Sequence, residues 1–258
     1  MTPITPDEYS VGNNNSDTVS LSNGTTVTLP IKYRKWTMAT AAFPAPISQL
    51  RDLLPSQLSP LRLLPRKGGV VLFSAEYQDA GSLDAYNEVG IMIPALHETD
   101  PGQWGMSPLS LLRLGRSYVK AYVQYLPVTT EEARSLGEIW GYPKEVAEVN
   151  IEDDDRTRRV SVHSDGKHVL TFEVDHARTR QQSVDLYPYT GQQGAVRARI
   201  ETQGEYAIRP FSNRASYTLG DHPQANILRS LDMGERPLSR VYATNLKSRF
   251  HSGQHLEH

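Results

Sequence analysis

Eight residues near the middle of the chain, Gly137-Glu138-Ile139-Trp140-Gly141-Tyr142-Pro143-Lys144, are the most informative part of the sequence. Pro143 lacks a backbone donor and disfavours helical geometry at Tyr142. We therefore expect Lys144 in a turn or at the beginning of an extended segment. Trp140 and Tyr142 are bulky aromatic residues that could hold its amine at the base of an apolar pocket.

A pocket of this kind matters because a lysine in water has a pKa of about 10.4 and is protonated at neutral pH. Burial disfavours the charged form and makes the amine available to attack a carbonyl. From residue types alone, however, a lysine after a proline is most often solvated. A tryptophan such as Trp140 is more often core than pocket wall.

Helical and strand patterns flank this stretch on both sides. Thr129-Thr130-Glu131-Glu132 fits a capping box, which predicts a helix from Thr129 to about Ile139. Asp165-Gly166 predicts a tight hairpin. Further helices are predicted at 47–55 and 224–231, and strands at 69–77, 87–94, 118–126, 146–151, 158–163, 169–174, 194–200 and 205–209.

The strand-helix alternation of a doubly wound sheet is absent from this order. We predict an α+β, mainly β fold in which an antiparallel sheet curls into a barrel decorated by a few helices. Residues 1–30, rich in Thr, Ser and Asn, predict a loosely ordered leader with a hairpin at Asn23-Gly24. Residues 31–253 are predicted to form a single domain, and 256–258 resemble a tag remnant.

Composition narrows the classes of partner. The chain has 258 residues, a net charge of -2 and no cysteine. Binding to nucleic acid or an anionic membrane is therefore not expected, and disulfides and thiolate sites are excluded. Without an apolar N-terminal run or a long apolar segment, the sequence predicts a cytoplasmic protein.

Other groups of polar residues do not predict a cofactor or a metal. His97-Glu98 and Asp100 lack the ligand spacing of a zinc helix, which favours a loop. Residues Glu152-Asp153-Asp154-Asp155 lack the spaced ligands of a calcium loop and predict a solvated turn. Glycine-rich phosphate loops and the Gly-x-Ser-x-Gly elbow are missing. We expect neither a nucleotide nor a metal.

The central stretch resembles the catalytic-lysine motif of the acetoacetate decarboxylase family, in which Tyr-Pro precedes the imine-forming lysine and a glutamate lies six residues before it. The resemblance extends over about residues 32–250. It includes Asn87-Glu88-Val89-Gly90 with Ile93-Pro94, the helix ending at Pro55, and the segment from Asp221-His222 to Val241-Tyr242.

The resemblance implies that Lys144 forms an imine with a small keto substrate, without a cofactor, in a homo-oligomer. It implies that Glu88 and Glu138 are the acidic residues of the site. The family's substrate-carboxylate arginine aligns with Arg34 or, after a slip of two residues, with Trp36. Candidate substrate contacts are Arg34, Phe73, Trp140, Tyr142 and Tyr242. For Tyr242, a structural role at a strand edge is an equal alternative.

Two departures from the family pattern bear on the reaction. The decarboxylases carry a second lysine directly after the first, where this chain has Glu145, and an acidic residue where it has Phe73. An anion close to Lys144 would favour its ammonium form. Either Glu145 points away, as strand alternation allows, or activation depends on burial alone.

The leading hypothesis from the sequence is a lysine-dependent lyase or aldolase-dehydratase that acts on a keto acid or a related keto metabolite through an imine on Lys144. Such an imine accepts the electron pair left by carbon dioxide or by a proton. The alternatives are an authentic acetoacetate decarboxylase and a non-catalytic barrel that binds a hydrophobic small molecule.

Overall fold

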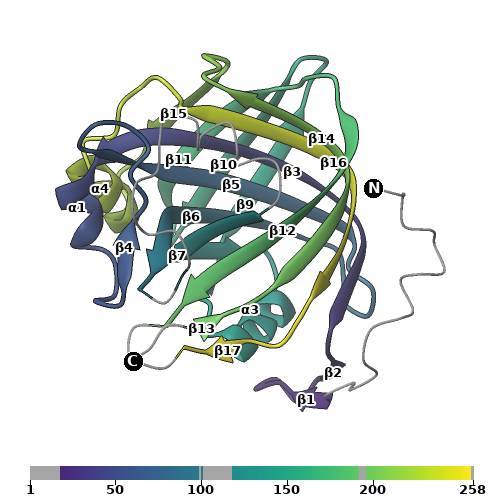
Figure 1. Cartoon of the computed structure of the whole chain (residues 1–258). Coiled ribbons are helices and arrows are strands. Elements are labelled where there is room, and N and C mark those ends of the chain that lie inside the picture. The colour runs from purple at the N-terminus through teal and green to yellow at the C-terminus, as the bar shows by residue number, and fades with distance from the viewer. Residues whose placement is uncertain (1–17, 99, 101–117, 192–195, 257–258) are drawn as a thin grey trace.

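Seven long strands form a closed barrel in the computed structural model, which describes residues 18–98, 100, 118–191 and 196–256 (Figure 1). Neighbours around the barrel run β12–β14–β16–β3–β5–β6–β7, and a parallel pairing of β7 with β12 closes it. The mainly β barrel is confirmed, but the parallel closure was not predicted. The strands are β3 (Ile31–Pro46), β5 (Lys67–Asp79), β6 (Tyr86–His97), β7 (Tyr118–Val128), β12 (Arg180–Thr190), β14 (Ile200–Pro210) and β16 (Ser239–Phe250).

A second sheet covers one side of the barrel (Figure 1). Its order is β15–β11–β10–β9, and all its pairings are antiparallel. The strands are β9 (Glu148–Asp153), β10 (Thr157–Ser164), β11 (Lys167–Asp175) and β15 (Ala215–Leu219). Asp165 and Gly166 join β10 to β11 with φ values of 50° and 70°, so the predicted tight hairpin is confirmed.

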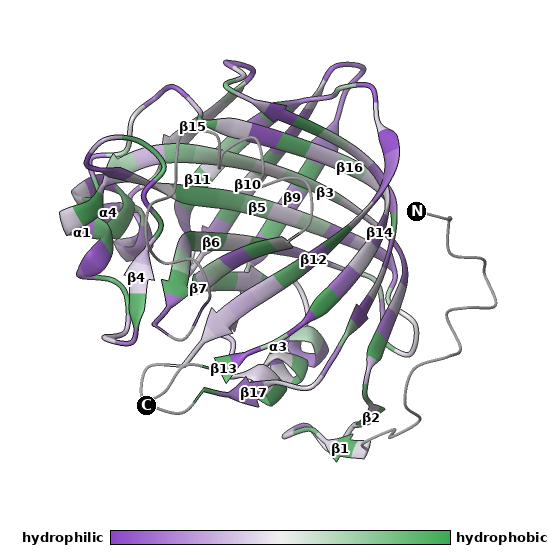
Figure 2. Cartoon of the chain, in the orientation of Figure 1, coloured by the Kyte–Doolittle hydropathy of each residue, from purple (hydrophilic) through white to green (hydrophobic). Residues whose placement is uncertain are grey.

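The sequence of strand β5 is continuously apolar, and the position of the strand in the barrel explains why. Val71 and Phe73 point into the barrel, whereas Val70 and Leu72 point outward into the core shared with the second sheet. Both faces of this strand are therefore buried, which abolishes the usual polar alternation. Along more exposed strands, hydrophobic and hydrophilic residues alternate (Figure 2).

Helices lie around the barrel: α1 (Ile47–Arg51), α3 (Glu131–Gly137), the 3-10 turn η2 (Glu138–Trp140) and α4 (Pro223–Ser230). Helix α1 is shorter than predicted. The predicted capping box is wrong by one residue, because Thr130 caps α3 by accepting from the Ala133 N–H at 3.2 Å. Thr129 and Glu132 instead accept backbone N–H groups of Asn87 and Asp84.

Residues 18–30 are more ordered than the predicted loose leader, and the predicted hairpin at Asn23-Gly24 is observed. Strands β1 (Thr18–Ser20) and β2 (Thr26–Thr28) form a hairpin, and Leu21, Val27 and Leu29 are buried in the core. Its loop spans five residues, and only Gly24 has a positive φ, at 83°. Residues 1–17 lie outside the described part of the chain.

Strand predictions between 180 and 210 need correction. Residues 200–210 form one continuous strand, β14, whose hairpin partner is the unpredicted β12. Of the predicted strand at 194–200, only β13 (Val196–Arg197) is observed before β14 begins, and 194–195 lie outside the described residues. Short strands β4 (Leu58–Pro60), β8 (Lys144–Val146) and β17 (Gln254–His255) complete the list.

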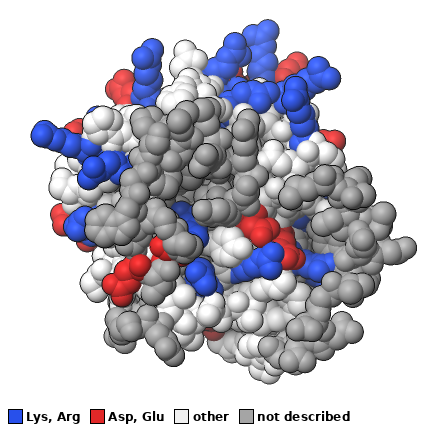
Figure 3. Space-filling model, in the orientation of Figure 1, with Lys and Arg blue, Asp and Glu red and all other residues white. Residues whose placement is uncertain are grey.

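The surface carries charges of both signs. On the face in Figure 3, basic side chains project mainly from the upper edge, with acidic side chains among them. This mixture agrees with the net charge of -2. None of the described helices has the length and apolar character needed to cross a bilayer.

Candidate active site

A cavity of about 200 Å³ occupies the inside of the barrel, and Lys144 lies in its wall. The 3-10 turn η2 ends at Gly141, whose φ of 64° lies in the left-handed region that glycine tolerates. The chain then extends, and Lys144 begins β8 by pairing with Leu126 of β7. The prediction that Lys144 starts an extended segment is confirmed.

The amine of Lys144 is paired with a carboxylate inside the barrel. Its Nζ lies 2.7 Å from Oε2 of Glu88, and the two side chains are only 5% and 8% exposed. Glu88 comes from β6 and opposes Ala75 of β5. Because desolvation offsets much of the attraction within a buried ion pair, such a pair is weak evidence for a purely structural role.

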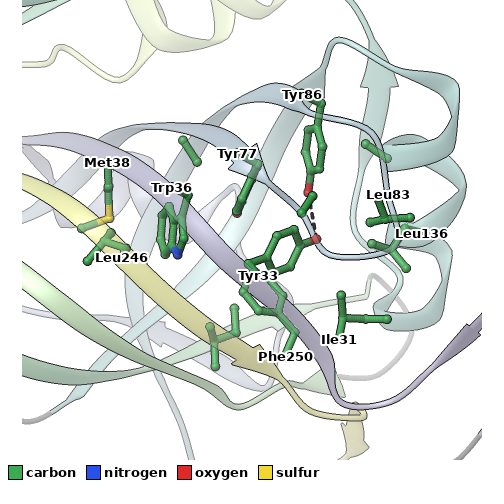
Figure 4. Packing of buried hydrophobic residues seen from close by; sticks show 14 of the residues in the cluster. Ile31, Tyr33, Trp36, Met38, Tyr77, Leu83, Tyr86, Leu136, Leu246 and Phe250 are labelled. Carbon is green, nitrogen blue, oxygen red and sulfur yellow. Dashed lines mark hydrogen bonds between the residues drawn. The ribbon is translucent and has the colours of Figure 1, made fainter. Parts of the chain in front are cut away.

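Tyrosine rings surround this pair. Lys144 Nζ lies 5.6 Å from the ring centroid of Tyr86 and 6.0 Å from that of Tyr142. The Tyr33 and Tyr86 hydroxyls are 2.9 Å apart, and Tyr77 packs between them and Trp36 (Figure 4). These rings exclude water from the amine while leaving hydroxyl groups nearby.

The phenols are held neutral. Burial raises the pKa of Tyr77 and of Tyr142 well above the ordinary value, and the charge of Glu88 raises each further. Burial likewise raises the pKa of Tyr33. Neutral hydroxyls can donate to a substrate oxygen. The sequence did not single out Tyr33, Tyr77 or Tyr86, because an inward tyrosine on a barrel strand has the same pattern as a core residue.

Close approach by a helix positions the lysine. A Cβ built on Gly137, the last residue of α3, would lie 2.6 Å from Cδ of Lys144. The absence of a side chain there lets the lysine pass the helix and reach Glu88.

Gly137→Ala should therefore displace the Lys144 side chain. We expect a stability loss of about 1–3 kcal/mol and imine formation at least about 10-fold slower, since misplacing a reactive group is costly. Urea unfolding and reductive trapping would measure the two effects. In a Lys144→Ala background the stability loss should shrink, because the side chain that clashes is gone. An equal loss in both backgrounds would contradict the proposed contact.

Glu145 points away from Lys144. Its Oε1 accepts hydrogen bonds from the hydroxyl of Ser164, at 2.8 Å, and from that of Tyr125. Burial raises the pKa of Tyr125, and the hydrogen bond to Glu145 raises it further. Successive side chains of an extended segment point to opposite sides, so this carboxylate faces β10 while the amine faces the cavity.

Glu145→Gln should consequently affect stability more than reactivity. Losing hydrogen bonds to a charged acceptor should cost about 1–3 kcal/mol in the free energy of unfolding, measured in urea. The rate of imine trapping should change by less than about threefold, because the charge is directed outward. An acceleration of 10-fold or more would show instead that Glu145 suppresses the amine.

Three predicted contact residues, Phe73, Trp140 and Tyr142, line the cavity. Between the two alternatives on β3, Trp36 lines it, whereas Arg34 is 70% exposed and lies 4.0 Å from Asp79. An irregularity in the pairing of β3 with β5 falls between Lys35 and Trp36. Because of this irregularity, Trp36 points inward and Arg34 points outward. The prediction that Arg34 reaches the substrate is therefore wrong.

Glu138 and Tyr242 do not reach the cavity. Glu138 is 44% exposed and accepts from Arg134 at 3.2 Å and Ser22 at 3.0 Å, because the 3-10 turn directs it outward. On β16, Val241 faces the cavity, and Tyr242 therefore faces the other side, where it stacks on His176 with centroids 4.4 Å apart. For Tyr242 the structural alternative describes the observed packing.

The two polar groups that the sequence analysis rejected as metal sites have structural partners. The His97 N–H donates to Asp100, which also accepts from Lys120 and Tyr189. Asp154 accepts backbone N–H groups in the turn between β9 and β10. Within the described residues, no group of three or more acidic or histidine side chains could hold a metal ion.

Comparison with known proteins identifies the family. A family model described as "Acetoacetate decarboxylase (ADC)" matches residues 19–247. The chain belongs to the acetoacetate decarboxylase family. The match spans the barrel, the second sheet and the Lys144 stretch, and it confirms the resemblance seen in the sequence. No curated protein sequence matches the chain.

Solved structures support the same fold at low sequence identity. An acetoacetate decarboxylase is 15% identical with a TM-score of 0.59, covering 88% of this chain and 89% of that one. The enduracididine biosynthesis enzyme MppR, complexed with the condensation product of pyruvate and imidazole 4-carboxaldehyde, is 13% identical with a TM-score of 0.61, covering 95% and 98%. Acetoacetate decarboxylase from Legionella pneumophila is 13% identical with a TM-score of 0.59, covering 96% and 98%.

Proposed function

We propose that this acetoacetate decarboxylase family member is a lyase that forms an imine between Lys144 and a keto substrate. The observation that carries the proposal is the buried Lys144 amine, 2.7 Å from Glu88, in the wall of an apolar cavity. Family membership and the MppR complex, which holds a condensation product of pyruvate, support a carbonyl ligand.

The ion pair supplies both forms that imine formation needs. Transfer of one proton from Nζ to Oε2 converts the ammonium and carboxylate into an amine and a carboxylic acid. The amine nitrogen attacks the carbonyl carbon, and the acid gives its proton to the carbonyl oxygen. Glu88 then carries a second proton from the nitrogen to the same oxygen, which leaves as water and yields the protonated imine. Apolar walls favour this transfer because it replaces two buried charges with two neutral groups.

The imine then serves as an electron sink. When a C–C bond to a carboxylate breaks, carbon dioxide leaves and its electron pair moves through the α carbon to the iminium nitrogen, giving an enamine. When an α proton leaves instead, Glu88 accepts it. Among the described residues that line the cavity, Glu88 is the one carboxylate, so we assign it the acid–base role in both reactions.

Two reactions remain as versions of the proposal. The outward direction of Glu145 removes one objection to decarboxylation, because its charge does not face the amine. An aldolase-dehydratase uses the same enamine with an aldehyde as the second substrate. The third alternative, a non-catalytic barrel, requires that the amine does not react.

Reductive trapping tests the proposal directly. The protein is incubated with borohydride and either acetoacetate or pyruvate, and the adduct is located by peptide mass spectrometry. We expect it on Lys144 and not on Lys167, an exposed lysine that serves as an internal control. The absence of an adduct with every carbonyl compound tested would contradict the proposal. Carbon dioxide release from acetoacetate would then separate decarboxylation from aldol chemistry.

A further inference from the structure

The cavity continues along the barrel well beyond the Lys144–Glu88 pair. On β6 its lining runs from Glu88 through Met92 to Pro94. The six steps from Glu88 to Pro94 span roughly 20 Å of extended strand at about 3.3 Å per residue. On β5 the pairing places Val71 opposite Met92, four residues beyond the level of Glu88. A substrate carbonyl held at Lys144 therefore leaves room for a long arm.

The walls of this continuation are apolar. Apart from the hydroxyls of Thr40 and Ser239, the described side chains that line it beyond the ion pair carry no polar group. They include Ala42, Val71, Phe73, Met92, Val123 and Val241. A charged or strongly hydrogen-bonding arm would lose its hydration here without gaining partners.

We propose that the substrate is a carbonyl compound with an unbranched aliphatic arm. The part bound in the cavity, carbonyl included, has about eight non-hydrogen atoms. This inference rests on the proposed imine at Lys144 and adds the chemical class of the substrate. The size follows from the cavity volume of about 200 Å³. An apolar protein cavity of about 150 Å³ holds benzene, with six non-hydrogen atoms.

Affinity should follow the length of the arm. Each methylene moved from water into the apolar wall should tighten binding about fourfold. Acetone and 2-hexanone differ by three methylenes, which predicts about a 60-fold difference in Kd. The gain should end near 2-heptanone, whose eight non-hydrogen atoms fill the volume.

The test is a titration of the full chain with the neutral methyl ketones from acetone to 2-nonanone. Trp36 and Trp140 line the cavity, so tryptophan fluorescence reports binding. Borohydride trapping on the same samples reports the imine. A progressive fall in Kd up to 2-heptanone supports the inference, and a Kd independent of chain length overturns it.

Two substitutions at Val71 should change the length of the cavity in opposite directions. Val71→Phe should shorten the preferred ketone by about two carbons, and Val71→Ala should lengthen it by about two, because the side chain lies at the apolar end away from the ion pair. An unchanged length preference in both variants overturns the inference, and the wild-type series remains decisive if either variant fails to fold.

The two readouts separate this inference from the proposed function. Adducts on Lys144 without any dependence on chain length leave the imine standing and overturn the aliphatic arm. Chain-length-dependent fluorescence without an adduct supports the aliphatic ligand and contradicts the lyase. If neither an adduct nor a chain-length-dependent fluorescence change appears, both proposals are overturned.

Discussion

Replacing Lys144 with methionine should abolish covalent trapping of every keto compound and destabilise the protein at the same time. Loss of trapping follows because no other described lysine lines the cavity. Loss of stability follows because Glu88 stays buried without the amine that lies 2.7 Å away. Leaving one member of a buried ion pair uncompensated costs about 3 kcal/mol or more. Intact mass after borohydride and urea unfolding measure the two effects.

The double variant Lys144→Met, Glu88→Gln provides the matched control. It removes both charges, so most of the stability lost in the single variant should return, while trapping stays absent. Stability equal to that of the single variant would mean that the pair is not the source of the loss. An adduct in either variant would place the reactive amine elsewhere.

Glu88→Gln should slow enamine formation by about 10²- to 10⁴-fold, the usual contribution of a positioned acid–base group. The amide keeps the shape of the side chain but cannot take the proton from Lys144 or from the substrate. Deuterium incorporation into the methyl groups of acetone, followed by NMR, measures enamine formation without assuming a second substrate.

Glu145→Gln is the control for this measurement, because it makes the same chemical change at a carboxylate that faces Ser164 instead of the cavity. Its exchange rate should stay near that of the wild type. Equal rates in Glu88→Gln and the wild type would assign proton transfer to another group, with the tyrosine hydroxyls as the next candidates.

Resemblance of short motifs to the family predicted the two residues at the centre of the site. Lys144 and Glu88, 56 positions apart, were both singled out, and the structure places them in contact. Glu138 and Arg34 were misplaced because one turn of 3-10 helix and one strand irregularity decide their directions. Such local changes of phase are set by tertiary packing, which a residue pattern does not record.

Strands were missed where their composition is atypical. β3 begins with Lys32, Arg34 and Lys35 on its exposed side and continues through several alanines, which have low strand propensity. β12 opens with Arg180-Gln181-Gln182-Ser183. Both are held by neighbours on each side, so pairing compensates for weak intrinsic preference. The barrel class was nevertheless predictable, because the sequence contains many strand patterns without the strand-helix alternation of a doubly wound sheet.

The pairing of β16 with β3 joins segments about 200 residues apart, and this has a consequence for biosynthesis. Strand β16 fills the gap between β3 and β14 in the barrel wall. On a ribosome, the earlier strands emerge while that gap is still open and their inner faces remain wet. Long-range pairing of this kind folds slowly. The amine at Lys144 therefore gains its dry surroundings only after β16 has been translated and inserted.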